Sequence, residues 1–484
     1  MFEVIDGVGK TYTRMQQMYK GLPVWGANLI EDQHGKIANG LFEDFRDINP
    51  AAYDPKEGLK VLKERHGMDK HVENEYDNAE AMIFIDEDSG RGAVTYLAST
   101  FVDETGLSEE PTRPMGIYTV DGKPVLEWEG LTTGSSSSSS SASKSHKRKE
   151  EKRKPPQQPP KRSTNPITDY GNGTCQLSTP QVKTMHLNNS RKRVTTPYTY
   201  DCYQQDADES NGAYSPLNDA HFYAHVVTEM FKDWYNAPPF MNKTGPLTVK
   251  THYKQNYANA FWNGKYVVFG DGDRRYHPFT TLDLVAHEIG HGVTEFTSNL
   301  VYRGQPGGLN EAFSDMTGIA AEFYFDGKLK KWSKGSNQTV DWRFGEDVKK
   351  SGPMRCLDVK CRRGIKHVKH YKKQAKHVHR TSGVFNKVFY LLSSQLPWGV
   401  WDAYDLFYIA NTRRWVSTTN FAQACAAELT LKTLEEMRDG LWHMVVPYNY
   451  RHIETSVVIG AFRQVGIECA RRDDFDYKCV LNDR

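Results

Sequence analysis

His287-Glu288-Ile289-Gly290-His291 is the stretch that decides the fold and the chemistry of this sequence of 484 residues. Apolar residues recur around it at helical spacing, which predicts a helix. A separation of four residues places the two imidazoles on one face of that helix, about 6 Å apart, where they can share a zinc ion. Glu288 would then lie beside a water on the metal. The alternative is a surface helix with two unconnected histidines.

A second helical stretch, which begins near Gly308, offers the remaining ligand. A catalytic zinc takes three protein ligands and keeps one position open for water, and Glu311 can be the third ligand. Asp315 lies one turn further on the same face, where it could accept the free ring N–H of a ligand histidine and fix its tautomer. The alternative is that both acids only complement the dipole of a helix N-terminus.

Composition and charge limit the class of protein. The sequence is 38% hydrophobic and 25% charged, which is typical of a globular chain with two or three domains. No run of 18 apolar residues predicts a membrane span, and the first residues do not form a secretory leader. Residues 1–133 carry 13 basic and 25 acidic side chains, whereas residues 134–163 carry 9 and 2. An acidic N-terminal block is therefore joined through a basic tether to a basic C-terminal block.

The clearest boundary is the tether itself. It contains seven consecutive serines, a Lys/Arg-rich run and a Pro/Gln-rich stretch that ends in Lys161-Arg162. We expect residues 134–163 to be a disordered linker, because such a composition buries too little apolar surface to offset the entropy of ordering. Its basic run is a solvated charge tract, a dibasic processing site, or a patch for nuclear localisation or nucleic acid.

The blocks on either side of the tether differ in pattern. The first combines a predicted helix at 55–66 with strands at 81–85 and 92–97, which indicates a small α+β domain. The second begins with strands at 247–253 and 265–270 and becomes helical from Thr280 onward. It should therefore divide into a β-rich lobe and an α-rich lobe. Three helices are expected there, marked by Leu282, Val285, Ile289 and Val293; by Ala312, Met316, Ile319 and Phe323; and by Val384, Val388, Leu391 and Leu392.

With these motifs the sequence resembles the thermolysin family, specifically its pseudolysin and vibriolysin branch. The resemblance runs from about Cys175 to Cys469. It rests on the zinc motif and on four further stretches: Asn310-Glu311-Ala312-Phe313-Ser314-Asp315, Gly212-Ala213-Tyr214-Ser215-Pro216-Leu217-Asn218-Asp219-Ala220-His221, Asn259-Ala260-Phe261-Trp262 and Ser382-Gly383-Val384-Phe385-Asn386-Lys387. The first block resembles the family's propeptide at 20–27 and 126–131. Since the family has a longer leader, we expect this chain to begin inside its pro-domain.

The resemblance implies an α+β fold in which a thermolysin-like two-lobed catalytic domain follows a small α+β propeptide domain. The active-site helix would lie between a β-rich N-lobe and an α-helical C-lobe. The implied domains are a propeptide at 1–133, the linker and processing site at 134–163, an N-lobe at 164–296 and a C-lobe at 297–484.

The family mechanism, carried over by residue, implies zinc on His287, His291 and Glu311. Glu288 would polarise the zinc-bound water and pass its proton to the leaving amine. Tyr302 and His379 would stabilise the tetrahedral oxyanion, where loss of one donor typically costs about 3 kcal/mol. Taken alone, Tyr302 could be a core aromatic residue and His379 one histidine of a basic tract.

The resemblance also implies a substrate site. Asn259 and Ala260 would bind the substrate backbone as an added strand, and Arg355 would hold a substrate carbonyl, although Arg355 alone reads as a surface charge. The pocket for the residue after the scissile bond would be apolar, which predicts cleavage before Leu, Phe or a similar side chain. Its lining would be Tyr276, Leu284 and Met354.

Two departures from the branch put activity and calcium binding in doubt. His377 stands two residues before the catalytic histidine, where the branch has an aspartate that favours the protonated imidazole. Of the calcium acids, Asp283 and Glu322 match, but Ile319 and Lys330 replace two others. We therefore expect calcium to bind weakly or not at all.

Cysteines and sequons indicate the compartment. The branch's disulfides imply the pairs Cys175–Cys202 and Cys425–Cys469. Cys356 and Cys361 could form a third bridge or, with His367 and His370, a second metal site. Together with four glycosylation sequons, matched disulfides favour a secreted glycoprotein. The sequons begin at Asn172, Asn188, Asn242 and Asn337.

These features predict a secreted zinc metalloendopeptidase, made as a zymogen, that hydrolyses peptide bonds on the N-terminal side of bulky hydrophobic residues. Its partners would be peptide or protein substrates and its own propeptide, acting as inhibitor and chaperone; no membrane or nucleic-acid partner is expected. The alternative is a weakened or inactive scaffold whose basic insertion at 360–380 binds polyanions such as sulfated glycans or nucleic acid. Intact Glu288, Tyr302 and His379 favour the enzyme.

Overall fold

A computed structural model describes most of the chain outside the tether. The described residues are 2–5, 11–32, 35–39, 41–42, 54–74, 76–86, 91–102, 110–133, 167–190, 194–202, 208–240, 245–332, 341–360, 364–396, 399–425, 455–473 and 476–482. The expected linker at 134–163 lies outside these residues, as do Cys361 and the sequons at Asn242 and Asn337. Asn172 and Asn188 are exposed, and their glycosylation stays a prediction.

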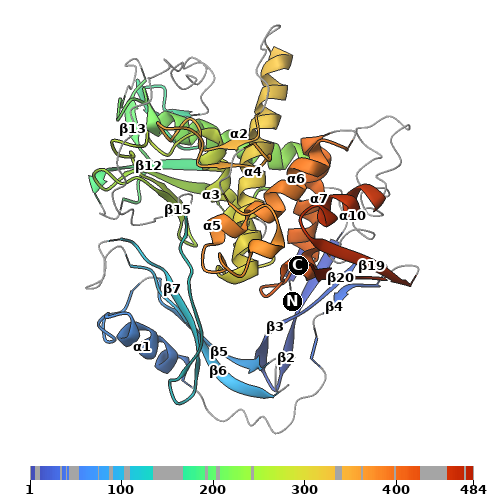
Figure 1. Cartoon of the computed structure of the whole chain (residues 1–484). Coiled ribbons are helices and arrows are strands. Elements are labelled where there is room, and N and C mark those ends of the chain that lie inside the picture. The colour runs from blue at the N-terminus through green and yellow to red at the C-terminus, as the bar shows by residue number, and fades with distance from the viewer. Residues whose placement is uncertain are drawn as a thin grey trace, which may run out of the picture.

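The N-terminal domain is a twisted sheet covered on one side by a helix, which confirms the expected small α+β domain (Figure 1). Helix α1 (Pro55–Arg65) begins at Asp54, whose side chain accepts a hydrogen bond from Lys56 N. Its Leu62 is buried against Ala98 and Tyr118 of the sheet. The strand order is β1-β2-β3-β5-β6-β7-β8, with β4 on β3. The strands are β1 (Phe2–Ile5), β2 (Thr11–Tyr19), β3 (Leu22–Asp32), β4 (Gly35–Asn39), β5 (Asn78–Ile85), β6 (Gly92–Ser99), β7 (Pro114–Thr119) and β8 (Pro124–Glu129).

A second sheet forms the β-rich lobe, in the order β12-β14-β16-β15-β9. Parallel pairs join β12, β14 and β16, whereas β15 is antiparallel to both of its neighbours. Helix α2 (Pro216–Tyr235) covers β12 and β14 and buries Val227 and Phe231. The strands are β9 (Thr132–Thr133), β12 (Val182–Ser190), β14 (Leu247–Tyr253), β15 (Ala260–Trp262) and β16 (Val267–Phe269). A small sheet joins β10 (Thr168–Asp169), β11 (Thr174–Gln176) and β13 (Thr199–Asp201).

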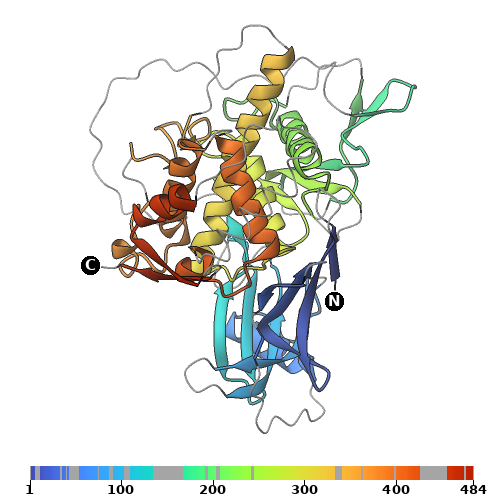
Figure 2. The same ribbon diagram turned by 90° about the vertical axis from the view of Figure 1, so that its right-hand side faces the viewer.

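The α-rich lobe surrounds the long helix α4 (Gly304–Trp332), which runs through the centre of the view in Figure 2. Helix α3 (Leu282–Glu295) lies between this lobe and the β-rich sheet and packs against both. The remaining elements are β17 (Arg343–Phe344), β18 (Arg355–Cys356), the 3-10 helix η2 (Val368–His370), α5 (Val378–Thr381), α6 (Gly383–Ser393), α7 (Val400–Arg413), α8 (Phe421–Cys425), α10 (Thr455–Arg463), β19 (Ile467–Asp473) and β20 (Asp476–Leu481). Among the described residues, no helix is both long and apolar enough to cross a bilayer.

Two glycines let α3 approach its neighbours closely. A Cβ on Gly290 would lie 3.0 Å from Cα of Ser314 in α4, and one on Gly292 would lie 2.4 Å from the ring of Phe240. The expected helices are confirmed as α3, α4 and α6. Phe323 lies in α4 as expected but is 37% exposed, because the last turns of α4 extend beyond the core.

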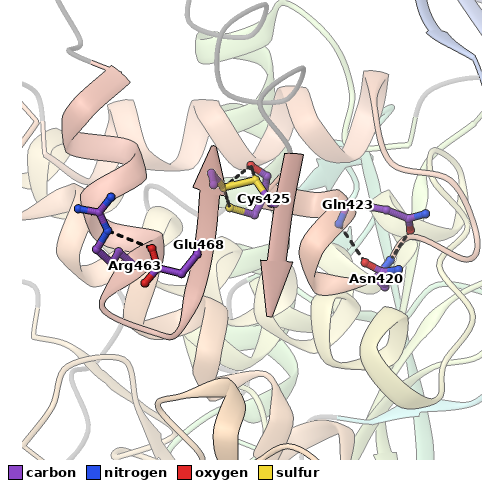
Figure 3. Close-up of a disulfide and its surroundings, with 7 residues drawn as sticks. Asn420, Gln423, Cys425, Arg463 and Glu468 are labelled. Atoms are coloured by element: carbon purple, nitrogen blue, oxygen red, sulfur yellow. Dashed lines mark hydrogen bonds and ion pairs between the residues drawn. A yellow bond between two sulfur atoms is a disulfide. The ribbon is translucent and has the colours of Figure 1, made fainter. Parts of the chain in front are cut away.

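The disulfides agree with expectation at one end of the catalytic region and differ at the other. Cys175 pairs with Cys202, as expected. The expected bridge between Cys425 and Cys469 is corrected: Cys469 pairs with Cys479, which faces it in the antiparallel register of β19 and β20. Cys425, a buried thiol at the end of α8, keeps its Sγ 3.0 Å from that of Cys469 (Figure 3).

The second metal site suggested around Cys356 is also corrected. Cys356 is disulfide-bonded, so its sulfur is not available as a thiolate ligand. His367 instead begins η2, where its Nδ1 accepts a hydrogen bond from Lys369 N.

Replacing Cys479 tests which disulfide forms among Cys425, Cys469 and Cys479. In Cys479→Ser we expect Cys469 to pair with Cys425, because their sulfurs already lie 3.0 Å apart. In Cys425→Ser the bridge between Cys469 and Cys479 should persist. Peptide mapping by mass spectrometry under non-reducing, acid-quenched conditions distinguishes the two bridges. A reduced Cys469 in the Cys479→Ser protein would contradict the expectation.

Candidate active site

Three buried side chains converge where α3 crosses α4. His287 and His291 extend from α3, and Glu311 extends from α4. The two Nε2 atoms are 3.0 Å apart, and the Glu311 carboxylate oxygens lie 3.7 Å from His287 Nε2 and 3.5 Å from His291 Nε2. These are separations expected of atoms that share one tetrahedral ion with bonds of about 2.0–2.1 Å.

Neighbouring acceptors set the tautomer of both imidazoles. His287 Nδ1 lies 3.0 Å from Asp315 Oδ1, and His291 Nδ1 lies 2.7 Å from Asn310 Oδ1. A carboxylate or amide oxygen can only accept a hydrogen bond, so each Nδ1 carries the proton and each Nε2 presents its lone pair to the site. Asp315 is therefore brought to the position that the sequence predicted for it.

Asp315 is in turn held by two further side chains. Arg355 Nε and Nη2 donate to its carboxylate at 2.8 and 2.6 Å, and Asn386 Nδ2 donates at 2.8 Å. Arg355 is only 6% exposed, so it is not a surface charge. Burial alone would raise the pKa of Asp315, but the charge of Arg355 and the contact with His287 hold that pKa well below its usual range.

The electrostatics of the ligand set favour a bound cation. Burial lowers the pKa of His287 to about 4 and the pKa of His291 well below its usual value, so both imidazoles are neutral near pH 7. Burial also raises the pKa of Glu311 to about 8. Neutral imidazoles are the form that coordinates zinc, and the Glu311 carboxyl releases its proton when a cation binds, so the residues present fit this metal.

Two of the three predicted catalytic side chains contact this set, and the third lies on the same helix as the two histidines. Glu288 is fully buried on α3, between the two histidines in sequence. Tyr302 OH donates to Oε1 of Glu311, and His379 Nε2 lies 3.4 Å from the same oxygen. His377, by contrast, is exposed at the N-terminus of α5.

The predicted substrate strand is partly occupied. Ala260 begins β15, and Phe261 and Trp262 pair with Thr133 and Thr132 of β9, the end of the N-terminal domain. Asn259, just before β15, keeps its carbonyl engaged with Gly270 N at 3.1 Å. Sequence reasoning missed the β9 pairing, since nothing in the local pattern of two residues indicates a strand partner so distant.

The residues expected to line the specificity pocket are apolar but lie apart from the described cavity. Leu284 is fully buried in α3, whereas Tyr276 and Met354 are partly buried against the same core. A cavity of about 250 Å³, partly open, lies instead between the N-terminal domain and the metal ligands. Its walls include Trp25, Arg113, Trp128, His291 and Tyr302.

Ionic and polar contacts hold the N-terminal domain over this region. Arg113 donates to both carboxylate oxygens of Glu295 in α3, at 2.7 and 2.9 Å, and Trp262 Nε1 donates to the same group at 2.8 Å. Arg14 reaches the carbonyl of Trp415 at 2.6 Å and that of Thr297.

Further acidic side chains lie near Asp283 and Glu322, the two acids expected at the calcium site. Burial and the charges of Asp283 and Glu346 raise the pKa of Glu322 well above its usual value, and the pKa of Glu346 is raised to about 9 by burial and by Asp283. Asp347 also adds to the negative potential. The loop after β17 therefore adds negative charge near Asp283 and Glu322. Within the described residues these acids do not form a group whose oxygens could share one ion, and weak calcium binding stays a prediction.

The site combines two buried histidines four residues apart on one helix, a buried glutamate from the next helix, and a second buried glutamate between the histidines in sequence. These groups define a zinc metallopeptidase. Comparisons with known proteins agree. The model of the thermolysin metallopeptidase catalytic domain matches residues 160–295, and that of its alpha-helical domain matches residues 298–467. The fungalysin/thermolysin propeptide motif matches residues 3–38.

Individual relatives support the same family. The neutral protease of Vibrio proteolyticus is 34% identical over 87% of this chain and 68% of its own. The hemagglutinin/proteinase of Vibrio cholerae is 33% identical over 96% and 72%, and a zinc metalloproteinase of Legionella pneumophila is 28% identical over 93% and 88%. A solved precursor of protealysin from Serratia proteamaculans, 26% identical, covers 60% of this chain and 89% of its own with a TM-score of 0.47.

This chain belongs to the thermolysin family of zinc metallopeptidases. It carries the family's propeptide motif, so it is a zymogen, and its N-terminal domain is the pro-domain.

Removing the acceptor of His287 should weaken metal binding. Asp315→Asn takes away the charge that orients this imidazole, and such a change outside the ligand set typically costs about 10–100-fold in metal affinity. Competition with a chromophoric chelator measures the affinity. Asp121→Asn, at an exposed turn of the pro-domain, is the control. Equal zinc affinities in the two variants would show that Asp315 does not support the metal site.

Proposed function

We propose that the mature protein is a secreted endopeptidase that cleaves before bulky hydrophobic residues, with Glu288, Tyr302 and His379 as its catalytic side chains. The observation that carries the proposal is that Tyr302 and His379 contact Glu311 of the ligand set, while Glu288 is buried on α3 between the two histidines in sequence. A helix that held two histidines only for packing would need none of them. The disulfide between Cys175 and Cys202 supports an oxidising compartment, and recovery of processed protein from culture medium tests secretion.

Each side chain has a role that its position allows. Zinc, when bound, supplies a Lewis acid that lowers the pKa of water from 15.7 to about 7 and polarises a carbonyl. Glu288 is fully buried, and in its ionised form it accepts the proton of the attacking water and delivers it to the leaving amine. Tyr302 OH and His379 Nε2 both point at the Glu311 side of the site, from which they can donate to an oxyanion.

Substrate is positioned by strand addition to β15. Backbone hydrogen bonds along this strand suit any peptide, so side-chain preference must come from a pocket. Leu284, Tyr276 and Met354 are the apolar residues that support a preference for Leu or Phe after the scissile bond. Arg355, held by Asp315, is the donor proposed for a substrate carbonyl.

The pro-domain is proposed to inhibit by occupying the same strand. Thr132 and Thr133 add to β15 in the antiparallel direction, and the Arg113–Glu295 pair fixes them beside the metal ligands. A peptide cannot use this edge while β9 is in place. Its role as a chaperone stays a prediction.

The decisive experiment compares Glu288→Gln with the unaltered protein after cleavage in the tether. Loss of the proton acceptor should lower kcat/KM on a quenched peptide by about 10²–10⁴-fold. The peptide carries Leu after the scissile bond, and a second peptide carries Gly there. Activity should be lost on zinc removal.

Glu229→Gln, an exposed glutamate on α2, is the matched control and should retain full activity. If zinc-loaded, folded protein cleaves neither peptide, the enzymatic proposal fails. Equal rates on both peptides would overturn only the proposed preference.

The inhibitory role of the pro-domain is tested through Arg113. Arg113→Ala removes the ion pair between Arg113 and Glu295, whose side chains are 17% and 26% exposed. We expect the cleaved pro-domain to be held about 5- to 100-fold less tightly, because a partly buried, bidentate charge pair is lost. This affinity is measured by diluting the cleaved protein and following how much peptidase activity appears as the pro-domain dissociates. Lys123→Ala, whose pair with Asp121 lies within the pro-domain, should leave inhibition unchanged.

A further inference from the structure

The segment 364–380 is strongly basic and borders the active site. No Asp or Glu occurs between Asp358 and Asp402, whereas six Lys or Arg fall within 364–380 alone. They are Lys366, Lys369, Lys372, Lys373, Lys376 and Arg380. The segment ends in α5, which carries His379.

This segment is folded rather than a loose insertion. Val368 is buried and its N–H donates to Val465 O at 2.9 Å, while Tyr371 packs edge-on against Phe421. Successive turns link Tyr371 O to Gln374 N and Gln374 O to His377 N, both at 2.8 Å. Ile365 N then closes the loop on Arg380 O at 2.9 Å. The apolar residues thus anchor the segment from within, and the cations between them face outward.

The outward cations form what we call the basic rim. Its exposed members are Lys369, His370, Lys372, Lys373, Lys376, His377 and Arg380. In the part of the chain that the structure describes, no carboxylate pairs with Lys369, Lys373 or Lys376. Exposed lysines of the pro-domain differ, because Lys70 and Lys123 each pair with an acid in their own domain.

The acidic pro-domain does not supply the missing counter-charge in the contacts described. Its polar contacts with the catalytic domain run through β15, Tyr266, Glu295, Thr297 and Trp415. Arg303, whose charge acts on Tyr371 of the segment, donates to Glu127 O of the pro-domain at 3.2 Å. Within the described residues, the pro-domain therefore leaves Lys369, Lys373 and Lys376 unpaired.

We propose that the basic rim binds a sulfated polysaccharide, an activity separate from peptide cleavage. Four of its five Lys or Arg residues are lysines, whose point charges on flexible stems suit a chain of repeated sulfates better than planar, bidentate groups. Single-stranded nucleic acid would need exposed aromatic rings for base stacking, and the aromatic residue here, Tyr371, is packed on Phe421. The rim would hold the enzyme on a glycan-rich surface beside its substrates.

Heparin is the probe for this proposal, with the full-length chain at 50 to 500 mM NaCl. The quadruple variant K369Q/K372Q/K373Q/K376Q removes four rim charges without touching a group assigned to catalysis. We expect its heparin affinity at 150 mM NaCl to fall at least tenfold, and the slope of log K against log[NaCl] to shrink by about 3, since each contact contributes about 0.7–0.9.

A matched variant, K56Q/K70Q/K123Q/K232Q, removes four exposed lysines elsewhere. Its heparin affinity and its salt slope should stay within about twofold of those of the unaltered chain, because the removed charges would make no contact with heparin. Peptide cleavage after tether processing should be the same in both variants. An equal loss in the two variants, or no heparin binding by the unaltered chain, overturns the proposal. Equally tight binding of single-stranded DNA or polyglutamate would also overturn it, because attraction would then be to charge alone.

Discussion

The contact between Asp315 and His287 is the interaction on which the rest of the active site depends. It joins α4 to α3 through a fully buried charge, and that charge is tolerated because Arg355 and Asn386 complete its hydrogen bonds. The close approach of the two helices at Gly290 makes the contact short. One carboxylate thus links the tautomer of a metal ligand, the position of Arg355 and the packing of two helices.

Much of this centre could be predicted from the sequence because it is encoded locally. Four-residue spacing fixes a helix face, and a run of apolar residues at the same period fixes which face is buried, so α3 and α4 followed from pattern alone. The positions of Asp315 and Glu311 then required only one turn of helix between them. Tyr302 and His379 are different, since they come from segments without such a pattern, and only the family resemblance drew attention to them.

What the sequence could not predict depends on contacts between distant segments. Cys469 has two sulfurs within reach, and the hairpin register of β19 and β20 decides between them. The acids of the loop after β17 come near Asp283 of α3 and Glu322 of α4 only after the chain folds back, so the sequence alone did not indicate their charge there. The same holds for β9, whose two residues reveal their role only beside β15.

The cavity under the pro-domain shows that the zymogen does not fill all the space beside the metal ligands. It is partly open, it measures about 250 Å³, and His291 and Tyr302 line it. A space of this size can hold water, whereas a peptide would need the edge of β15 that β9 occupies. If a small ion can pass through this space, metal loading and unmasking are separate events, and a compact chelator would strip the latent form without waiting for processing.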